Sequence, residues 1–347
     1  MPNEILYLCH SGIDYLQDGL YHGLVSLLGK GRVVDWPRQA RFHERLDSLI
    51  PSVGFYSQSE PSRPQTAWGL RRQLRAGRFG LVAIAAGRKH AFRAWRDVMD
   101  ACRQLPAVFV DGGDHAELAG QLAWERKTSL RRDVLNARPF DLIFKREHHG
   151  PDVNHPKILP IAFCLPENHY RPPSPPIKKT REVAFWGGAS SASRAVAIEK
   201  LKNVRDFARN RSVEFRGEDF MCELAATKVC LSFWGAGDDT MRYWEIPCAG
   251  SLLMAQKPRS PIPDNFIDRR EAVFVRDDLS DLIDLVNYYC DHDDEREEIA
   301  RAGRKRFLKC HTTRARAKYF LDALHERNLY QAGTLEDSPA DKADPAA

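Results

Sequence analysis

Short apolar runs alternate with longer segments of helical period through the first half of the chain. Leu20, Leu24, Leu27 and Leu28 fall at i, i+4, i+7 and i+8, so they share one face of a predicted helix that ends near Gly29. A strand precedes this helix and another follows it, which predicts parallel neighbours joined by a long crossover. The strands predicted in this half are residues 5–9, 32–36, 81–85, 107–110, 142–145 and 158–163.

The periodicity disappears at Leu165–Pro166 and through the proline-rich run of residues 171–176. Each proline fixes its own φ and favours extended geometry in the residue before it, so we expect a stiff connector. A second series follows, with strands at 182–186, 213–215, 229–233, 251–254 and 272–275 and a helix at 192–203. Two more helical faces come later, formed by Leu282, Val286 and Tyr289 and by Ala317, Phe320, Leu321 and Leu324.

These elements predict an α/β protein with two Rossmann-like, doubly wound domains that face each other across a cleft. The expected boundaries are an N-terminal domain at 1–166, a proline-rich linker at 167–181 and a C-terminal domain at 182–330. The acidic segment 331–347 has almost no large apolar residues and is expected to be disordered. In open sheets of this kind, ligands bind beyond the carboxyl ends of the strands, so candidate chemistry is sought there.

Composition narrows the class of protein. Hydrophobic residues make up 43% and charged residues 29%, as in soluble globular proteins. No run reaches the roughly 18 apolar residues that cross a bilayer, and the N-terminus lacks the pattern of a secretion signal, which predicts a cytoplasmic protein. The eight cysteines form no C-x-x-C pair, and we interpret them as reduced core residues.

The net charge of +5 is too small for a sequence-specific nucleic-acid binder, but it suits phosphate-bearing ligands or an anionic membrane surface. Basic runs occur at Arg71–Arg78 and Arg126–Arg132. Each is interpreted either as a solvated helix face or as a docking surface for anionic lipid or an acidic partner, so peripheral contact with the inner membrane is a further expectation. The oligomeric state is not predicted.

The densest group of candidate functional residues lies at 235–253, directly after a predicted strand. It combines Asp238, Asp239, Arg242 and Glu245 with three glycines between two apolar runs. An acid at the start of a helix can accept both hydroxyls of a ribose, while backbone N–H groups and an arginine hold a diphosphate. A nucleotide-diphosphate sugar presents both features.

The pattern R-x-x-E-x-x-x-x-G, here Arg242 to Gly250, is followed by an apolar strand at 272–275, an A-x-x-G at 300–303 and the pair His311-Thr312. This order of elements resembles the C-terminal domain of spore-maturation-type, group 1 glycosyltransferases of the GT-B fold, over about 110 residues. The resemblance implies a sugar-nucleotide donor in the C-terminal domain and an acceptor in the N-terminal domain. It also implies that Glu245 contacts the donor ribose and that Gly250 lies in the helix turn beside it.

Other donor-binding candidates are Arg242 as a diphosphate clamp, and Gly187, Gly188 and Arg194 in the turn after strand 182–186. Small residues there let a phosphate approach backbone N–H groups, although a tight turn capped by serine has the same appearance. Asp238 and Asp239 are interpreted as helix caps, as sugar ligands or, less favoured, as metal ligands. No metal is predicted, and no cofactor beyond the donor substrate is required. Residues 215–219 are expected near the nucleotide base of the donor.

One departure from the family pattern affects stereochemistry. Many related retaining enzymes have a second glutamate eight residues before the first, and this chain has Gly237 there, with Asp238 and Asp239 as alternatives for the missing acid. The resemblance therefore leaves inversion and retention both open.

In the N-terminal half, Asp14 and His10 follow the first strand and are candidates for the catalytic base, alongside Arg242 as the catalytic cation. Asp18 is expected to cap the next helix. Candidate acceptor-binding residues follow two later strands: Asp111, Asp114, His115, Lys145 and Arg146. Each is also compatible with a structural role. His148 and His149 are adjacent, so in extended chain they point in opposite directions and cannot form a metal pair alone.

The sequence therefore predicts a glycosyltransferase that moves a sugar from a nucleotide-diphosphate sugar to an acceptor hydroxyl; family grounds alone indicate bacterial surface glycan or a related glycoconjugate. The alternative is a non-catalytic nucleotide- or glycan-binding module of the same fold. A nicotinamide-dependent oxidoreductase is disfavoured because no G-x-G-x-x-G opens either domain.

Overall fold

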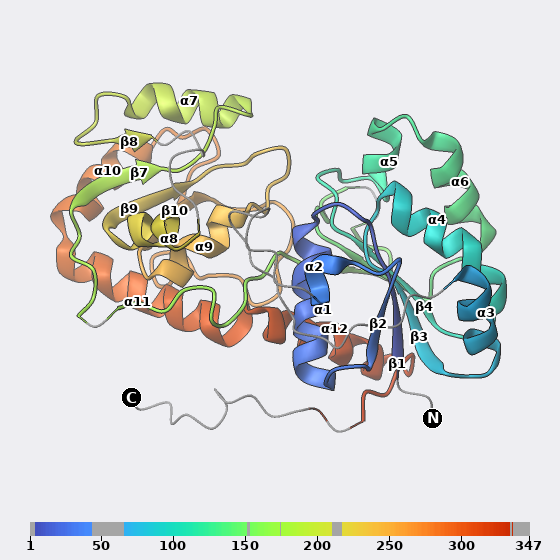
Figure 1. The fold of residues 1–347 in the computed structure, drawn as a ribbon. Coiled ribbons are helices and arrows are strands. Elements are labelled where there is room, and N and C mark those ends of the chain that lie inside the picture. The colour runs from blue at the N-terminus through green and yellow to red at the C-terminus, as the bar shows by residue number, and fades with distance from the viewer. Residues whose placement is uncertain are drawn as a thin grey trace. The chain divides into compact units, whose positions relative to one another are not determined.

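The computed structural model describes residues 4–43, 66–150, 153–173, 175–209, 217–333 and 335. Three predicted features lie outside the described residues: the strand at 213–215, the Arg216 that follows it, and the tail from residue 336. The chain divides into two units (Figure 1). Within the described part, the first unit holds residues up to 162 and from 313 onward, and the second holds residues 163–312.

The first unit is built on a parallel sheet with strand order β2-β1-β3-β4-β5-β6. Its strands are β1 (Glu4–Leu8), β2 (Val33–Trp36), β3 (Phe79–Ile84), β4 (Ala107–Asp111), β5 (Leu142–Lys145) and β6 (Ile158–Pro160). All six were predicted, and the last, β6, is shorter than the expected 158–163.

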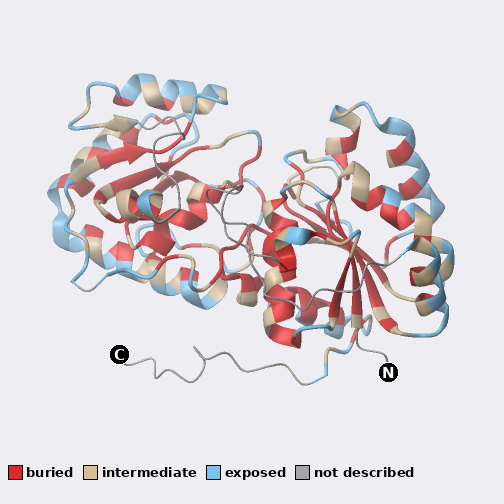
Figure 2. Ribbon diagram, in the orientation of Figure 1, coloured by how far each residue is buried: buried red, intermediate tan, exposed pale blue. Residues whose placement is uncertain are grey.

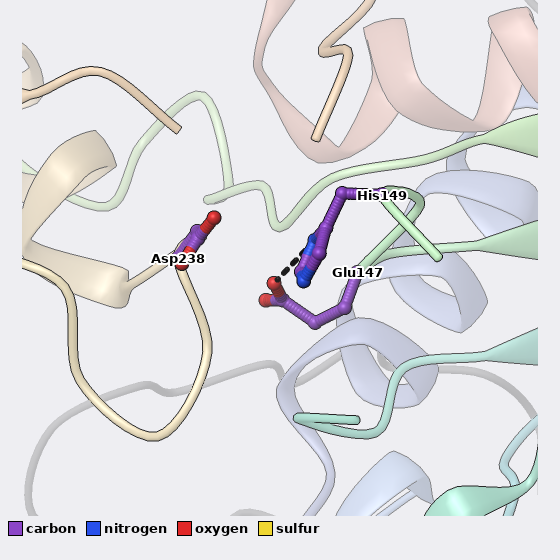
Figure 3. Close-up of side chains that lie close together, drawn as sticks. All are labelled: Glu147, His149 and Asp238. Carbon is purple, nitrogen blue, oxygen red and sulfur yellow. Dashed lines mark ion pairs between the residues drawn. The ribbon is translucent and has the colours of Figure 1, made fainter. Parts of the chain in front are cut away.

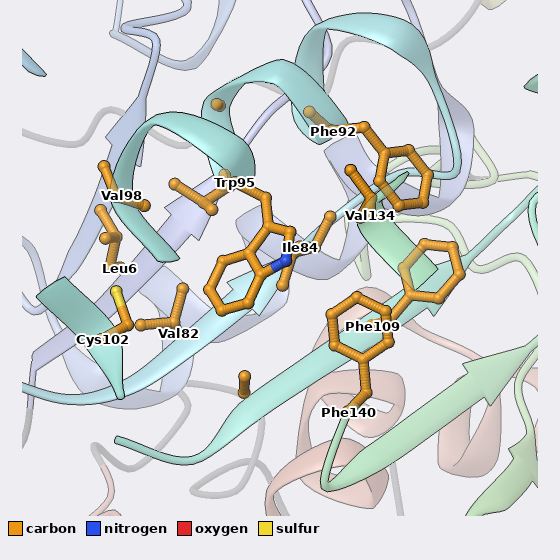
Figure 4. Packing of buried hydrophobic residues seen from close by; sticks show 14 of the residues in the cluster. Leu6, Val82, Ile84, Phe92, Trp95, Val98, Cys102, Phe109, Val134 and Phe140 are labelled. Atoms are coloured by element: carbon orange, nitrogen blue, oxygen red, sulfur yellow. The ribbon is translucent and has the colours of Figure 1, made fainter. Parts of the chain in front are cut away.

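Helices cover both faces of this sheet (Figure 1). They are α1 (Tyr15–Leu28), α2 (Ala40–His43), α3 (Ala67–Arg75), α4 (Lys89–Val98), the short 3-10 helix η1 (Met99–Cys102), α5 (Gly120–Trp124), α6 (Thr128–Ala137) and α12 (Thr313–Glu326). The core on one side packs Trp95 of α4 and Val134 of α6 against Leu6, Ile84 and Phe109 of the strands (Figure 4). The alternation of apolar runs with segments of helical period therefore correctly predicted a sheet covered by helices.

The C-terminal helix α12 lies in the first unit, which differs from the predicted assignment of residues 182–330 to one domain. It packs along α1, where a Cβ on Gly23 would lie 2.0 Å from the Thr313 carbonyl oxygen. Phe320 also packs on Phe144 of β5, with ring centroids 4.7 Å apart. The periodic face of Phe320 and Leu324 is buried as predicted, but periodicity does not say which partner buries it.

The second unit has a parallel sheet of order β11-β10-β9-β7-β8. Its elements are β7 (Arg181–Phe185), α7 (Ala192–Leu201), β8 (Ala208–Arg209), α8 (Gly217–Ala225), β9 (Thr227–Ser232), α9 (Met241–Ala249), β10 (Leu252–Gln256), β11 (Val273–Val275), α10 (Leu282–Asp291) and α11 (Asp293–Cys310). Val183, Leu231 and Met254 of the strands form its core with Val286 and Tyr289 of α10. Figure 2 shows the central strands of both sheets as mostly buried.

In each sheet, the direction in which successive strands are added reverses at one place. Counted within each unit, the strand order is 2-1-3-4-5-6 in the first and 2-1-3-4-5 in the second, so the connections leave in opposite directions from the first and third strands. A crevice forms at the carboxyl ends of such a strand pair, and it is the usual ligand position in open α/β sheets. The pairs are β1 and β3 in the first unit and β7 and β9 in the second.

Candidate functional site

In the second unit, two arginines lie in the first turns of the helices that follow β7 and β9. Arg194 belongs to α7, whose N-cap Ser191 accepts a hydrogen bond from the Arg194 N–H at 3.2 Å. Arg242 belongs to α9, which begins at Met241. Because unsatisfied N–H groups give each helix N-terminus a partial positive charge, the two helices and the two side chains together favour an anion at this switch point.

The guanidinium groups of these arginines are held by backbone carbonyls. Arg194 Nε donates to the Phe233 carbonyl at 3.2 Å and Nη1 to Ser190 Oγ at 2.8 Å, while Arg242 Nε donates to the carbonyl of Trp186. In the described part of the chain neither forms an ion pair with a carboxylate. Burial, together with repulsion from Arg242, lowers the pKa of Arg194 to about 10, which leaves the Arg194 guanidinium charged at neutral pH.

Glu245 lies one helical turn after Arg242 on α9, so the two share a face. Its side chain is only 4% exposed, and within the described residues its Oε2 has no hydrogen-bond partner. Burial raises the pKa of Glu245, and the positive charge of Arg242 offsets part of that increase. A buried carboxylate oxygen without a partner is costly, which is the property expected of a group that a ligand satisfies. Arg194, Arg242 and Glu245 are called the arginine–glutamate site below.

Glycines shape this site. A Cβ on Gly235 would lie 2.8 Å from Arg194 Nη2, so a larger residue would displace the guanidinium. Gly188 is exposed, and no atom of the described residues lies within 4 Å of its Cβ position, which leaves its backbone open to an approaching group. Gly187 is tight instead, because its Cβ would meet the Phe185 ring at 2.8 Å.

Gly250 ends α9 at φ 81°, in the left-handed region that glycine adopts without strain. It lies in the turn that follows Glu245, where the family resemblance placed it. The role visible in the structure is to end the helix.

Gln256 at the end of β10 ties the loops around the site together. Its Oε1 accepts from Ser193 Oγ at 2.5 Å and from the Trp234 N–H at 3.2 Å, and its Nε2 donates to the Asp277 carbonyl at 2.9 Å. It is 2% exposed. Gln256 was not predicted as a site residue, because a glutamine at a strand end belongs to no motif.

Asp238 and Asp239 are engaged within the second unit. Both oxygens of Asp238 pair with Arg259, at 2.7 Å from its Nε and 2.7 Å from its Nη2. Asp239 accepts from Trp244 Nε1 at 2.6 Å and from the Phe163 N–H at 2.7 Å. Neither is the cap of α9, since the N-cap position is Thr240. The prediction that they bind a donor sugar stays untested, and these contacts favour a role in fixing the loop.

In the first unit, the switch point between β1 and β3 holds both candidate bases. Asp14 is the N-cap of α1: it accepts from the Gln17 N–H at 3.1 Å and pairs with Arg88 at 3.1 Å. The prediction that Asp18 caps this helix is wrong, because Asp18 lies inside α1 and pairs with Arg41 at 2.9 Å. Two acids four residues apart look alike in sequence, and the start of the helix decides between them.

His10 stacks on His90, with ring centroids 4.9 Å apart, and Ser11 Oγ hydrogen-bonds to His90 Nδ1. Within the described residues, His10 Nδ1 has no hydrogen-bond partner. Burial, with the neighbouring charges of Arg88 and His90, lowers the pKa of His10 to about 4. The imidazole is therefore neutral at pH 7, and its lowered pKa makes it a weaker base than a free imidazole.

The predicted acceptor residues form a buried cluster at the ends of β4 and β5. Asp111 is 0% exposed; it pairs with Lys145 Nζ at 3.1 Å and accepts from the Ala119 N–H at 2.8 Å. Lys145 also donates to the His115 carbonyl. Asp111 and Lys145 thus neutralise each other, and both form hydrogen bonds to backbone groups of the adjoining loop.

Arg146 extends this cluster. Its side chain is fully buried and pairs with Glu147 at 2.7 Å and with Asp114, whose side chain is 47% exposed. Glu147 Oε2 in turn lies 3.7 Å from His149 Nδ1 (Figure 3). Contact of these residues with an acceptor stays a prediction, and burial favours the structural interpretation for all except Asp114 and His115.

Residues 180–322 match the glycosyl transferase-like family. This confirms the predicted resemblance to group 1 glycosyltransferases for that part of the chain, while the spore-maturation subtype stays a prediction. None of the curated proteins has a sequence significantly similar to this chain.

Solved structures match nearly the whole chain. The Anabaena protein HepE, solved in complex with UDP and glucose, matches with a TM-score of 0.59 at 13% identity, over 93% of this chain and 99% of that one. HepE in complex with UDP-glucose matches with a TM-score of 0.57 over the same shares. A glycosyltransferase from Rickettsia africae matches with a TM-score of 0.54 at 9% identity, over 93% and 98%. The chain therefore has the predicted GT-B fold.

No helix within the described ranges is both long and apolar enough to cross a membrane.

Proposed function

From the glycosyl transferase-like family of residues 180–322 and the GT-B fold of the chain, we propose that this protein transfers a sugar from a nucleotide-diphosphate sugar to an acceptor hydroxyl. The observation that carries the proposal is the arginine–glutamate site. A buried carboxylate oxygen without a partner lies on the same helical face as an arginine, and a second arginine lies in the neighbouring helix turn.

The chemistry of this site matches the two polar parts of such a donor. Glu245 accepts hydrogen bonds from the ribose hydroxyls, and Arg194 and Arg242 neutralise the diphosphate together with the N-termini of α7 and α9. When the bond between the anomeric carbon and the phosphate oxygen breaks, negative charge develops on the leaving diphosphate. Fixed cations stabilise that charge without having to reorganise. The open backbone at Gly188 lets a phosphate approach closely.

The donor class agrees with what is bound by proteins of the same fold. HepE was solved with UDP and glucose and with UDP-glucose. This likeness supports a nucleotide sugar as donor. The base and the sugar are left to experiment, as is the choice between inversion and retention. The donor is a substrate, so the proposal requires no cofactor.

We place the acceptor in the first unit, at the switch point between β1 and β3. The acceptor oxygen attacks the anomeric carbon and its proton passes to a base. His10 suits this role better than Asp14, because its neutral ring has a nitrogen without a partner whereas Asp14 already caps α1 and pairs with Arg88. Asp114 and His115 are the remaining acceptor candidates at the carboxyl ends of the strands. A cytoplasmic role in assembling bacterial surface glycan completes the proposal.

A thermal-shift screen tests the donor assignment. The full chain is heated with UDP-glucose, UDP-N-acetylglucosamine, GDP-mannose and ADP-glucose, since a ligand of the folded state raises the melting temperature. We expect one donor to stabilise the protein, with slow release of free sugar on longer incubation. Tight binding without any hydrolysis or transfer would instead identify a non-catalytic binding module. Stabilisation by none of a full panel would reject the donor site.

A further inference from the structure

Three helices of the first unit present a surface that the proposed reaction does not use. Helix α4 packs against both α3 and α6, so the three form one layer over the sheet (Figure 1). Their inner sides are buried in the core through residues such as Leu70 of α3. Trp95 of α4 and Val134 of α6 belong to the same core (Figure 4). Their outer sides contain the exposed residues that Figure 2 draws in pale blue.

Two tryptophans are exposed on helices of this part of the first unit. Trp68 in the first turn of α3 is 71% exposed, and Trp124 at the end of α5, just before α6, is 72% exposed. They are the most exposed large hydrophobic side chains in the described part of the chain. Leaving two indole rings in water is unfavourable, so exposed aromatic side chains with basic neighbours indicate a binding surface.

Basic side chains surround both rings. Arg71, Arg72 and Arg75 follow Trp68 at i+3, i+4 and i+7, so they share its face of α3, and all are exposed. Trp124 is followed by the exposed pair Arg126 and Lys127. Between the two groups, α4 exposes two more arginines three residues apart, Arg93 and Arg96. These seven cations and two tryptophans are called the basic face below.

The charge on the basic face is not neutralised locally. None of its seven cations forms an ion pair in the described ranges, although Arg71 donates to the Asp97 carbonyl. Three of the acids nearby are used elsewhere: Asp100 pairs with Arg103, Glu117 with Arg131 and Asp133 with Arg132. Asp97 of α4 forms no ion pair in the described ranges, so it offsets one of the seven positive charges. Residues 67–137 contain 13 lysines and arginines against 7 aspartates and glutamates, a surplus of 6 in a chain whose net charge is +5.

We propose that the basic face docks on an anionic lipid bilayer. A bilayer surface supplies phosphates for the unpaired guanidinium groups and an interfacial layer in which tryptophan rings are favoured. The apolar sides of α3, α4 and α6 are committed to the core, so the helices cannot turn over and insert. Docking is therefore shallow: it depends on the two rings and on charge, and it weakens as salt screens that charge.

Co-sedimentation of the full chain with vesicles tests the docking without depending on catalysis. We expect binding to vesicles of phosphatidylcholine with one quarter phosphatidylglycerol, little binding to phosphatidylcholine alone, and release at high salt. Replacing both rings, with Trp68→Ser and Trp124→Ser, should weaken partitioning about tenfold. Arg72→Gln with Arg75→Gln should also weaken it by about tenfold, because each basic residue near the surface contributes to the attraction.

A matched control comes from α11, where Arg301 and Lys305 are exposed in the second unit. Arg301→Gln with Lys305→Gln removes the same two charges, and its partitioning should stay that of the wild type. Equal weakening by this control would overturn the proposal in favour of a response to net charge. Absence of binding to anionic vesicles by the wild type would overturn it as well. Single-stranded RNA that binds the basic face and displaces the vesicles would assign the face to nucleic acid instead.

Discussion

Charged side chains gather at the carboxyl ends of both sheets, but their partners differ. In the first unit, Asp111 and Lys145 pair with each other inside the protein. In the second unit, Arg194 and Arg242 have no acid paired with them in the described part of the chain, and Glu245 Oε2 has no hydrogen-bond partner there. Both groups appear in the sequence as acids and bases after a strand. The difference shows that complete pairing indicates a structural role, whereas charge left without partners indicates a ligand.

Removing Asp111 gives the largest expected effect. Asp111→Ala leaves the buried Lys145 ammonium without its counterion, and breaking a buried pair in this way costs about 3–5 kcal/mol of unfolding free energy. Chemical denaturation measures this loss. Asp114→Ala is the comparison variant: it leaves the buried Arg146 paired with Glu147, so losing the partly exposed Asp114 carboxylate should cost less than about 1 kcal/mol. If Asp111→Ala kept full stability and lost transfer activity, Asp111 would belong to the acceptor site.

Removing Arg242 should have the opposite result, with a large loss of activity and little loss of stability. Arg242→Ala withdraws one cation from the leaving diphosphate and should lower kcat about 10²–10³-fold, in line with losses on removing a donor that stabilises transition-state charge. Its unfolding free energy should change by less than about 1 kcal/mol, because no ion pair is broken. Arg269→Ala, at an exposed arginine of the same unit, should leave kcat unchanged. Full activity of Arg242→Ala would remove Arg242 from the mechanism.

A methyl group at Gly235 tests whether Arg194 acts through its position. Gly235→Ala brings a Cβ to 2.8 Å from Arg194 Nη2 and displaces the guanidinium without removing it. We expect about tenfold weaker donor binding by calorimetry, which corresponds to one charge-assisted hydrogen bond of about 1.5 kcal/mol. Gly69→Ala on α3, whose Cβ makes only an ordinary contact at 3.4 Å, should bind the donor as the wild type does. Unchanged donor affinity of Gly235→Ala would show that the exact place of Arg194 does not matter.

The smallest expected effect is a pH dependence of stability. Burial raises the pKa of Glu245, so the folded state holds a proton that the unfolded state releases above its ordinary pKa near 4.5. Stability should therefore fall as pH rises from about 4.5 through the raised value, and Glu245→Gln should lack this fall.

Glu271 should give a pH dependence of stability with the opposite sign, because its pKa is lowered. Although burial acts to raise its pKa, the hydrogen bond from Arg306 lowers it overall. Its contribution to stability is present above the unfolded pKa and is lost as pH falls. Comparing Glu245→Gln with Glu271→Gln by denaturation from pH 4 to 8 separates the two directions. Parallel pH profiles of the two variants would contradict the account of Glu245.

Much of the fold follows from local pattern. The helical face of Leu20, Leu24 and Leu28 and the predicted strands of the first sheet report which residues are buried, because each element hides one face or stripe. The same information does not name the partner. Helix α12 shows this: the period of Phe320 and Leu324 predicted burial, but only the packed structure shows that α1 and β5 provide it.

The candidate site was partly predictable for the same reason. The spacing of Arg242 and Glu245 is local and places both on one helical face, and the resemblance named their roles. Whether a charge is satisfied depends on residues far away in sequence. Asp238 is held by Arg259, and Gln256 links loops that begin at three different strands, and neither relation has a sequence signal.

The ribose contact of Glu245 is the central claim, and a calorimetric cycle tests it. The nucleoside diphosphate that stabilises the protein best and its 2′,3′-dideoxy form are each titrated into the wild type and into Glu245→Gln. The account predicts that the wild type prefers the ribose form by about 10–100-fold, the worth of a hydrogen bond to a charged group, and that Glu245→Gln loses most of that preference. An equal preference in both proteins would contradict it.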